Sequence, residues 1–168
     1  MKKIIPILFV FFLVYGYANK EEILIPSDAI RFRVIANSDD KLDQELKMEV
    51  KQAIEEEVNK LMIDAKNSEE AKLLIENNLE KIEQIVNQYT KDNNVSFGIN
   101  YFPEKEYHGV TYPSGNYESL VITLGNGIGS NWWCVMFPPL CLLEAKNENT
   151  EEINYKLYVQ EIIEKYTS

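Results

Sequence analysis

The segment Asn131–Cys141, NWWCVMFPPLC, contains both tryptophans and both cysteines of the 168-residue chain. A disulfide between Cys134 and Cys141 would close a loop of eight residues, for which the chain-entropy model gives about 2.5 kcal/mol of stability. The alternative is a pair of buried free thiols that pack as small apolar side chains. A zinc site is disfavoured, because zinc takes three or four ligands and the only histidine is His108. We expect the disulfide, which makes this segment a short closed loop.

Trp132 and Trp133 are adjacent, and successive side chains of an extended strand point to opposite faces of a sheet. The two indoles therefore cannot both point into one core. We expect one of them to face outward or to lie beneath a loop. An outward tryptophan would be an anchor for a partner, because tryptophan brings a large contact area at a small cost in conformational entropy.

The N-terminus has the three parts of a secretory signal. Lys2 and Lys3 precede an uncharged run over residues 4–18, and charged sequence follows it. We expect cleavage after Ala18 and a single domain over residues 19–168. The alternative is an uncleaved anchor, but the fifteen residues of the run, at 1.5 Å each, would span about 22 Å of a hydrocarbon core roughly 30 Å thick. Export also suits a disulfide.

The exported part of the chain is acidic. Loss of the two leader lysines changes the formal charge from −10 to −12. Such a surface repels nucleic acid and anionic membrane faces alike, because binding to either depends on basic side chains. Neither is expected as a partner, and the acidity is most simply a device for solubility.

The first half of the chain predicts a strand followed by two helices. Residues 30–36 alternate apolar side chains with Arg31 and Arg33, which predicts a strand with one buried face and one exposed basic face. The polar residues 37–40 predict caps for a helix start, and Asn67 with Glu70 predicts a capping box for a second helix. The expected buried positions are Leu42, Leu46, Val50, Ala53, Ile54, Val58, Leu61 and Met62 in the first helix, and Ala71, Leu74, Ile75, Leu79, Ile82, Val86 and Tyr89 in the second. Glutamates Glu45, Glu49, Glu55 and Glu56 are expected to face water.

The second half predicts strands and one more helix. Alternating apolar residues over 95–101 and 117–124 predict two strands, the second of them central because both of its faces are apolar. Residues 104–109 are expected to be a turn, and helical spacing returns over 151–166 through Ile153, Leu157, Ile162 and Tyr166. The predicted fold class is α+β. A small sheet of three to four strands packs against an antiparallel helix pair, with a cysteine-bracketed loop and a C-terminal helix.

Motifs for catalysis are weak in this sequence. The glycine loop 125–129, GNGIG, lacks the spacing of a nucleotide-binding motif. Ser114 is not in a nucleophile elbow. Cys134 with His108 would resemble a thiol hydrolase only if the thiol were free. A carboxylate pair is harder to exclude, but from residue 107 to residue 143 the only charged side chain is Glu118. Neither an enzyme nor a cofactor is favoured.

Two parts of the chain together resemble the stage II sporulation protein R family of endospore-forming bacteria. The first part is residues 30–39, IRFRVIANSD, followed by Asp43-Gln44 and Leu46-Lys47. The second combines residues 112–118, YPSGNYE, with residues 131–141. The resemblance extends from about Ile30 to Leu143, and the order and spacing of NWWCVMFPPLC make it highly specific.

The resemblance implies a signalling protein rather than an enzyme. Members of the family are made in the forespore and exported into the space between forespore and mother cell. There they are needed to activate a membrane-embedded aspartic protease, which removes the inhibitory pro-sequence from the precursor of sporulation sigma factor E. This protease is therefore the expected partner, bound at its extracytoplasmic face, and no small-molecule substrate is expected.

Partner contact is predicted for residues of the two signatures. These candidates are Arg31, Arg33, Asn37, Ser38, Asp39, Asn131, Trp132, Trp133, Phe137, Pro138 and Pro139. A ligand of this kind activates a protease only if it binds the active arrangement, for instance a dimer, better than the resting one. The alternative function is an exported hydrolase that acts on a cell-wall or peptide substrate.

Overall fold

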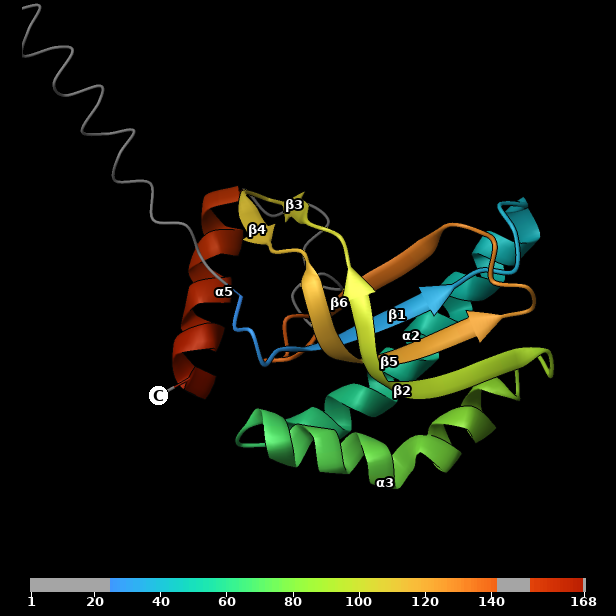
Figure 1. Cartoon of the computed structure of the whole chain (residues 1–168), viewed down its shortest axis with the longest axis horizontal. Coiled ribbons are helices and arrows are strands. Elements are labelled where there is room, and N and C mark those ends of the chain that lie inside the picture. The colour runs from blue at the N-terminus through green and yellow to red at the C-terminus, as the bar shows by residue number, and fades with distance from the viewer. Residues whose placement is uncertain (1–24, 142–151, 168) are drawn as a thin grey trace, which may run out of the picture.

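A mixed sheet of four strands forms the centre of the fold, in the order β2-β5-β1-β6 (Figure 1). Its strands are β1 (Ile30–Ile35), β2 (Asn93–Phe102), β5 (Gly115–Leu124) and β6 (Asn131–Phe137). β1 is parallel to β5, whereas the pairs β1–β6 and β2–β5 are antiparallel. The predicted α+β class is confirmed, and β5 lies inside the sheet as expected.

The computed structural model describes residues 25–141 and 152–167. The predicted signal sequence and its cleavage after Ala18 lie outside these residues. None of the described helices is long and apolar enough to cross a membrane.

Two helices, α2 (Lys41–Asp64) and α3 (Ser68–Val86), pack side by side over one face of the sheet (Figure 1). Their apolar stripes bury the alternate strand residues that point toward them, such as Phe32 and Val34 of β1. The prediction that Leu42 belongs to this core is wrong, because the buried stripe begins one turn later, at Leu46, and Leu42 is 78% exposed.

The two helix starts differ. At α3 the Asn67 half of the capping box is confirmed, because the Asn67 side chain accepts a hydrogen bond from the Glu70 amide at 2.9 Å. The Glu70 carboxylate accepts from the Lys66 amide at 3.0 Å, one residue before the Asn67 amide that a capping box uses. At α2 the expected side-chain cap is wrong, because the N-cap residue Asp40 makes no such bond. The side chains of Asn37 and Asp39, just before it, bond instead to the loop between β5 and β6.

A second layer covers part of the opposite face of the sheet. It consists of the hairpin β3 (Lys105–Tyr107) and β4 (Val110–Tyr112) and of helix α5 (Glu152–Thr167) (Figure 1). The prediction of a turn over residues 104–109 is only partly right, since β3 pairs with β4 and only His108 and Gly109 form the turn. Both have positive φ, 46° and 73°, which suits a two-residue hairpin loop.

The second apolar core lies between this layer and the sheet, and five of its eleven members are aromatic. Its members are Ile25, Ala29, Phe102, Val110, Tyr112, Tyr117, Trp133, Val135, Leu140, Tyr155 and Val159. The predicted C-terminal helix is confirmed as α5, but it packs through Tyr155 and Val159, and Leu157 is 60% exposed. The hydroxyls of Tyr112 and Tyr155 hydrogen-bond at 2.7 Å inside this core.

The predicted disulfide joins Cys134 of β6 to Cys141, with 5.4 Å between the two Cα atoms. Both cysteines are buried, and the chain between them turns back through a cis Phe137-Pro138 bond. The Leu140 amide then donates to the Val135 carbonyl at 3.2 Å. The loop therefore lies against the end of β6.

Replacing both cysteines in the double variant Cys134→Ala/Cys141→Ala should lower the free energy of unfolding by about 2–4 kcal/mol, because an eight-residue loop is no longer closed in the unfolded chain. Urea unfolding monitored by tryptophan fluorescence measures the loss. As a control, dithiothreitol should lower the midpoint of the parent protein and leave that of the double variant unchanged. Equal midpoints for the oxidised and reduced parent would contradict a stabilising disulfide.

Candidate partner-binding cleft

Asn37, Ser38 and Asp39 hold the loop between β5 and β6. The Asn37 side-chain oxygen accepts a hydrogen bond from the Asn126 amide at 2.9 Å, and the Asp39 carboxylate accepts one from the Ser130 amide at 2.7 Å. The Asn37 and Ser38 side chains also donate to one oxygen of Asp43, at 2.8 and 2.5 Å. We call these bonds, both those within residues 37–47 and those that join them to residues 126–130, the loop network. It uses the polar atoms that sequence reasoning assigned to a helix cap and to a partner.

The loop network also includes two residues of α2. Lys47 is buried, and its ammonium donates to Gln44 at 2.6 Å and to the Ser130 carbonyl at 3.2 Å. The pKa of Asp39 is lowered chiefly by its hydrogen bonds from Ser130, and that of Asp43 by its bonds from Ser38 and Asn37. Both carboxylates are thereby kept in the charged form that accepts these bonds.

Glycine is required in this loop because the backbone of the β1–α2 connection lies against it. A Cβ atom on Gly129 would lie 2.2 Å from the Ser38 carbonyl oxygen. The Gly129 amide also donates to the Ala36 carbonyl at 3.0 Å. The glycine loop, which sequence reasoning interpreted as a turn rather than a phosphate site, is thus a packing contact between two connections.

Arg31 does not form an exposed basic face, and that prediction is wrong. Its side chain is 0% exposed. The guanidinium carbon lies 4.2 Å from the ring centroid of Tyr117 and 4.8 Å from that of Trp133, and Phe102 and Tyr112 are each at 5.6 Å. We call these four rings the aromatic box. Arg33 is half-buried beside it, with its guanidinium 3.9 Å from the Phe102 centroid and donating to the Tyr101 carbonyl at 2.8 Å.

The positive charge of Arg31 is balanced by aromatic rings rather than by a carboxylate. Burial lowers its pKa, and the neighbouring hydroxyls of Tyr117 and Tyr112 offset this in part. None of its three side-chain nitrogens has a standard hydrogen-bond partner among the described residues. Because an arginine stays protonated, contacts with the ring faces, each typically about 0.5–2 kcal/mol, must offset the cost of burial.

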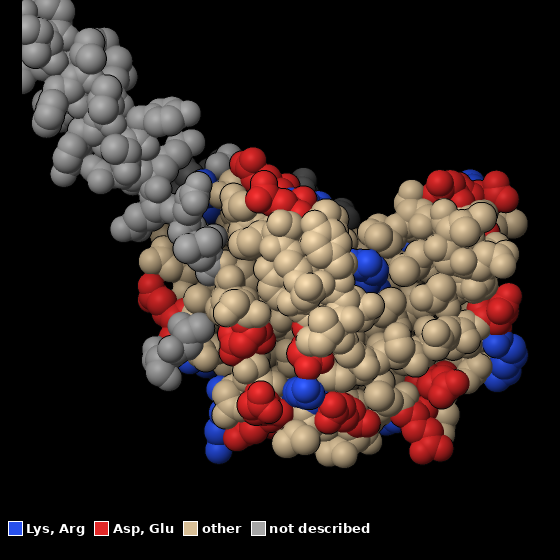
Figure 2. Space-filling model, in the orientation of Figure 1, with Lys and Arg blue, Asp and Glu red and all other residues tan. Residues whose placement is uncertain are grey.

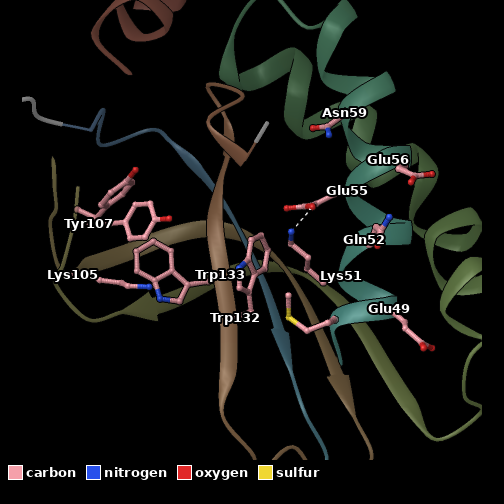
Figure 3. A pocket seen from close by; sticks show the side chains of 12 residues that line it. Glu49, Lys51, Gln52, Glu55, Glu56, Asn59, Lys105, Tyr107, Trp132 and Trp133 are labelled. Carbon is pink, nitrogen blue, oxygen red and sulfur yellow. Dashed lines mark ion pairs between the residues drawn. The ribbon is translucent and has the colours of Figure 1, made fainter. Parts of the chain in front are cut away.

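Trp132 and Trp133 occupy opposite faces of β6, as alternation requires (Figure 3). Trp132 points to the helix side, where its ring is 5.7 Å from that of Phe32. Trp133 is 9% exposed and lies under the β3–β4 hairpin, in contact with Tyr112. Each indole has a lysine ammonium over its ring: Lys51 at 4.5 Å from Trp132 and Lys105 at 5.2 Å from Trp133.

A cleft of about 710 Å³ opens between α2 and the hairpin, with both tryptophans in its lining (Figure 3). We call it the tryptophan cleft. Its α2 wall consists of Met48, Glu49, Lys51, Gln52, Glu55, Glu56 and Asn59, and its other wall of Lys105, Tyr107 and Tyr112. This cleft combines large aromatic surfaces with charged groups of both signs, which is the composition of a protein-recognition site.

Glu55 is the unusual group of the cleft, and the prediction that it faces water is wrong. Its side chain is buried, and one carboxylate oxygen pairs with Lys51 at 2.6 Å. The other oxygen, Oε1, has no hydrogen-bond partner among the described residues. Burial raises the pKa of Glu55, and the nearby Lys51 lowers it in part. An unsatisfied buried acceptor of this kind typically costs about 1–3 kcal/mol.

The predicted contact residues do not form one surface. Trp132 and Trp133 line the cleft, whereas Asn131 is exposed and is not among the lining residues. Phe137 is buried with its ring 5.2 Å from that of Tyr166 in α5, and Pro138 is also buried. Pro139 is half-buried. Arg31, Arg33 and residues 37–39 support the strand that carries the tryptophans, from the sheet face and from the loop network.

Sequence reasoning placed no charged residue in the cleft: Lys51 and Lys105 were not singled out, and Glu55 was expected to face water. The i,i+4 spacing of Lys51 and Glu55 is a usable signal for their ion pair. Lys105 gives no such signal, because its approach to Trp133 depends on the hairpin fold. Cys134 is in the disulfide, which removes the thiol that a cysteine–histidine hydrolase needs. Among residues 25–141 and 152–167 there is no cluster of histidine, cysteine and acidic residues that could hold a metal.

Comparisons with known proteins agree on one family. Residues 26–147 match the family described as stage II sporulation protein R. A curated protein of Bacillus subtilis (strain 168), named stage II sporulation protein R, is 36% identical over 162 residues, which cover 90% of this chain and 72% of the relative. No solved structure matches the chain significantly. The matched residues include the loop network, the aromatic box and the tryptophan cleft.

The variant Gly129→Ala should lower the free energy of unfolding by about 2 kcal/mol or more, because the new methyl group would collide with the Ser38 backbone. Gly98→Ala is the matched control, since a Cβ at Gly98 meets nothing within 4 Å, and it should leave stability within about 0.5 kcal/mol of the parent. Chemical denaturation compares the two. Equal losses would show that the close approach of the two loops is not needed.

At Arg31, the apolar variant Arg31→Met should be more stable than the charge-conserving Arg31→Lys, by at least about 1 kcal/mol. The reason is that a buried ammonium without hydrogen-bond acceptors costs more than a planar guanidinium stacked on rings. Thermal and urea unfolding of both variants test the order. If Arg31→Lys were closer to the parent than Arg31→Met, the charge itself would be the stabilising feature.

Proposed function

The chain belongs to the stage II sporulation protein R family, and we propose that it is an exported signal that activates the processing of the sporulation sigma factor E precursor. Its target is the membrane-embedded aspartic protease that removes the pro-sequence of that precursor, and it acts by binding the extracytoplasmic face of the protease. It is made in the forespore and works in the space between forespore and mother cell. The family match over residues 26–147 carries this proposal, because family members are expected to have this role.

Features of the chain itself support export and binding. The first 18 residues have the composition of a secretory signal. A disulfide suits an oxidising compartment outside the cytoplasm. In the space-filling view, charged side chains of both signs lie along the margin formed by α3, further acidic side chains cluster at the upper margin, and the middle of the face over the sheet is mostly uncharged (Figure 2). Such a domain stays soluble while it presents a restricted surface for recognition.

The tryptophan cleft offers a contact of the size that activation needs. Moving a two-state equilibrium from 1:99 to 99:1 needs about 5.5 kcal/mol of difference in binding free energy between the two states. A tryptophan contact at the centre of an interface is typically worth about 2–4 kcal/mol. Trp132 is half-buried and open to a partner, whereas Trp133 is 9% exposed and has little surface left to bury. Engagement of Trp132 by the active state, together with the charged groups of the cleft, would supply much of the required difference.

The second candidate function is the exported hydrolase, and one observation favours it. Glu55 has a raised pKa inside a cleft, as a general acid would. A hydrolase would act in amounts far below those of its target, because each molecule turns over many times. A ligand instead gives an effect that rises with its concentration until its site on the protease is saturated. Titrating the exported chain against a fixed amount of protease separates the two.

Co-expression in a non-sporulating bacterium tests the proposed function. The host carries the candidate protease and the sigma factor precursor, with or without this chain, and immunoblotting measures the processed fraction. Processing should depend on the chain and should fall at least about tenfold in Trp132→Ala. Tyr101→Ala is the matched control, because Tyr101 is an exposed aromatic on β2, the opposite edge of the sheet.

A second variant distinguishes a loss of recognition from a loss of folding. Lys105→Glu changes an exposed residue of the cleft rim and should also reduce processing while secreted amounts stay normal. Processing without the chain would overturn the proposed function. Processing that requires the chain, while the purified chain fails to bind the extracytoplasmic region of the protease, would overturn direct docking.

A further inference from the structure

The tryptophan cleft follows the free edge of the sheet. Trp132 and Trp133 point to opposite faces of β6, yet both line the same cleft. A single cleft can reach both faces of one strand only by passing around its edge. β6 is the terminal strand of the sheet and pairs only with β1 among the described strands. The cleft is therefore an opening beside a strand edge that no other described strand pairs with.

One hydrogen bond shows which backbone groups of β6 face this opening. The Val135 carbonyl accepts from the Leu140 amide at 3.2 Å, and Leu140 is not part of β1, so the backbone groups of Val135 point away from β1. Backbone groups alternate along a strand. Those of Asn131 and Trp133 therefore also point away from β1, and those of Trp132 and Cys134 face Val34 and Phe32.

The open part of this edge is short. At one end Leu140 bonds to Val135. At the other end β6 begins at Asn131, directly after the loop network. Among the described residues, the outward backbone groups that remain are those of Asn131 and Trp133. An extended chain of three or four residues, roughly 10–14 Å long, matches this length.

The α2 wall indicates the chemistry of an occupant. Glu55 is 6% exposed, and its Oε1 atom has no partner among the described residues, although its carboxylate is directed toward the tryptophans (Figure 3). Glu49 and Glu56 add two exposed carboxylates on the same wall, and the only lysine there already pairs with Glu55. A hydrogen-bond donor that carries positive charge would satisfy Oε1 and suit these neighbours.

We propose that the tryptophan cleft binds an extended peptide segment of a partner protein, which adds a strand beside Asn131 and Trp133 and places a lysine or arginine against Glu55. Backbone pairing at the edge gives affinity, and the side-chain contact gives specificity, as in other cases of strand addition. The identity of the source rests on the proposed function: the segment belongs to an extracytoplasmic part of the protease.

The test begins with a library of random seven-residue peptides displayed on phage and selected on the purified full chain. Enriched peptides should combine β-branched or aromatic residues with one lysine or arginine. The best sequence is then synthesised, and its affinity is measured by fluorescence polarisation. Glu55→Gln should weaken binding at least tenfold, whereas Glu83→Gln, a matched change of an exposed glutamate on α3, should leave it unchanged.

N-methylated peptides test the strand pairing directly. Methyl groups on the alternate amides that face β6 should reduce affinity at least tenfold, and methyl groups on the other alternate amides should have little effect. Equal effects in the two registers would overturn strand addition. Binding that does not change in Glu55→Gln would overturn the role of the basic residue.

Other results would overturn the proposal as a whole. No enrichment of peptides on the chain is one of them. Another is self-association by sedimentation that Trp132→Ala abolishes, since a second copy would then be the occupant. The peptide assay contains no protease, so it is independent of the processing assay. Peptide binding without processing would overturn the proposed function alone, and processing without peptide binding would overturn this inference alone.

Discussion

The hydrogen bonds between the β1–α2 connection and the β5–β6 loop determine where every residue of β6 lies. Asn37 and Asp39 accept from the amides of Asn126 and Ser130, and the Ala36 carbonyl accepts from Gly129. These bonds fix the residue at which β6 begins. Because side chains alternate along a strand, a slip of one residue would exchange the faces of Trp132 and Trp133. The cleft, the aromatic box and the disulfide all depend on this register.

The two faces of the sheet have different chemistry, and the tryptophan cleft lies where they meet. The helix side is largely aliphatic, with Trp132 at its border. The other side encloses Arg31 in four aromatic rings, one of which is Trp133. An occupant of the cleft would therefore contact both cores of the protein at once. The binding of an occupant would then depend on the packing of both the hairpin and α2, whereas binding at a site on one face would depend on only one of them.

Sequence patterns predicted what depends on local spacing. The helices, the interior strand β5, the side-chain cap at Asn67 and the Cys134–Cys141 bond all follow from residues close together in the chain. Alternation also identified which residues share a face, but charge was a poor guide to exposure. Arg31 is buried because rings from β2, β4, β5 and β6 surround it. These rings come together only in the folded protein, so no local sequence pattern predicts the contact. The cleft escaped prediction for the same reason, since Lys51 and Lys105 are far apart in sequence.

An exposed sheet edge is normally a hazard, because it offers unpaired backbone groups to any extended chain. Here the disulfide loop closes the edge at Val135, and β6 begins at Asn131 directly after the loop network, so among the described residues only a short stretch of the edge is open. Carboxylates on the α2 wall then disfavour acidic occupants, and this chain itself is strongly acidic. The same features that keep the edge from pairing with further copies of the chain make it selective for a short basic strand. Protection of the edge and recognition of a partner are, in this fold, consequences of one arrangement.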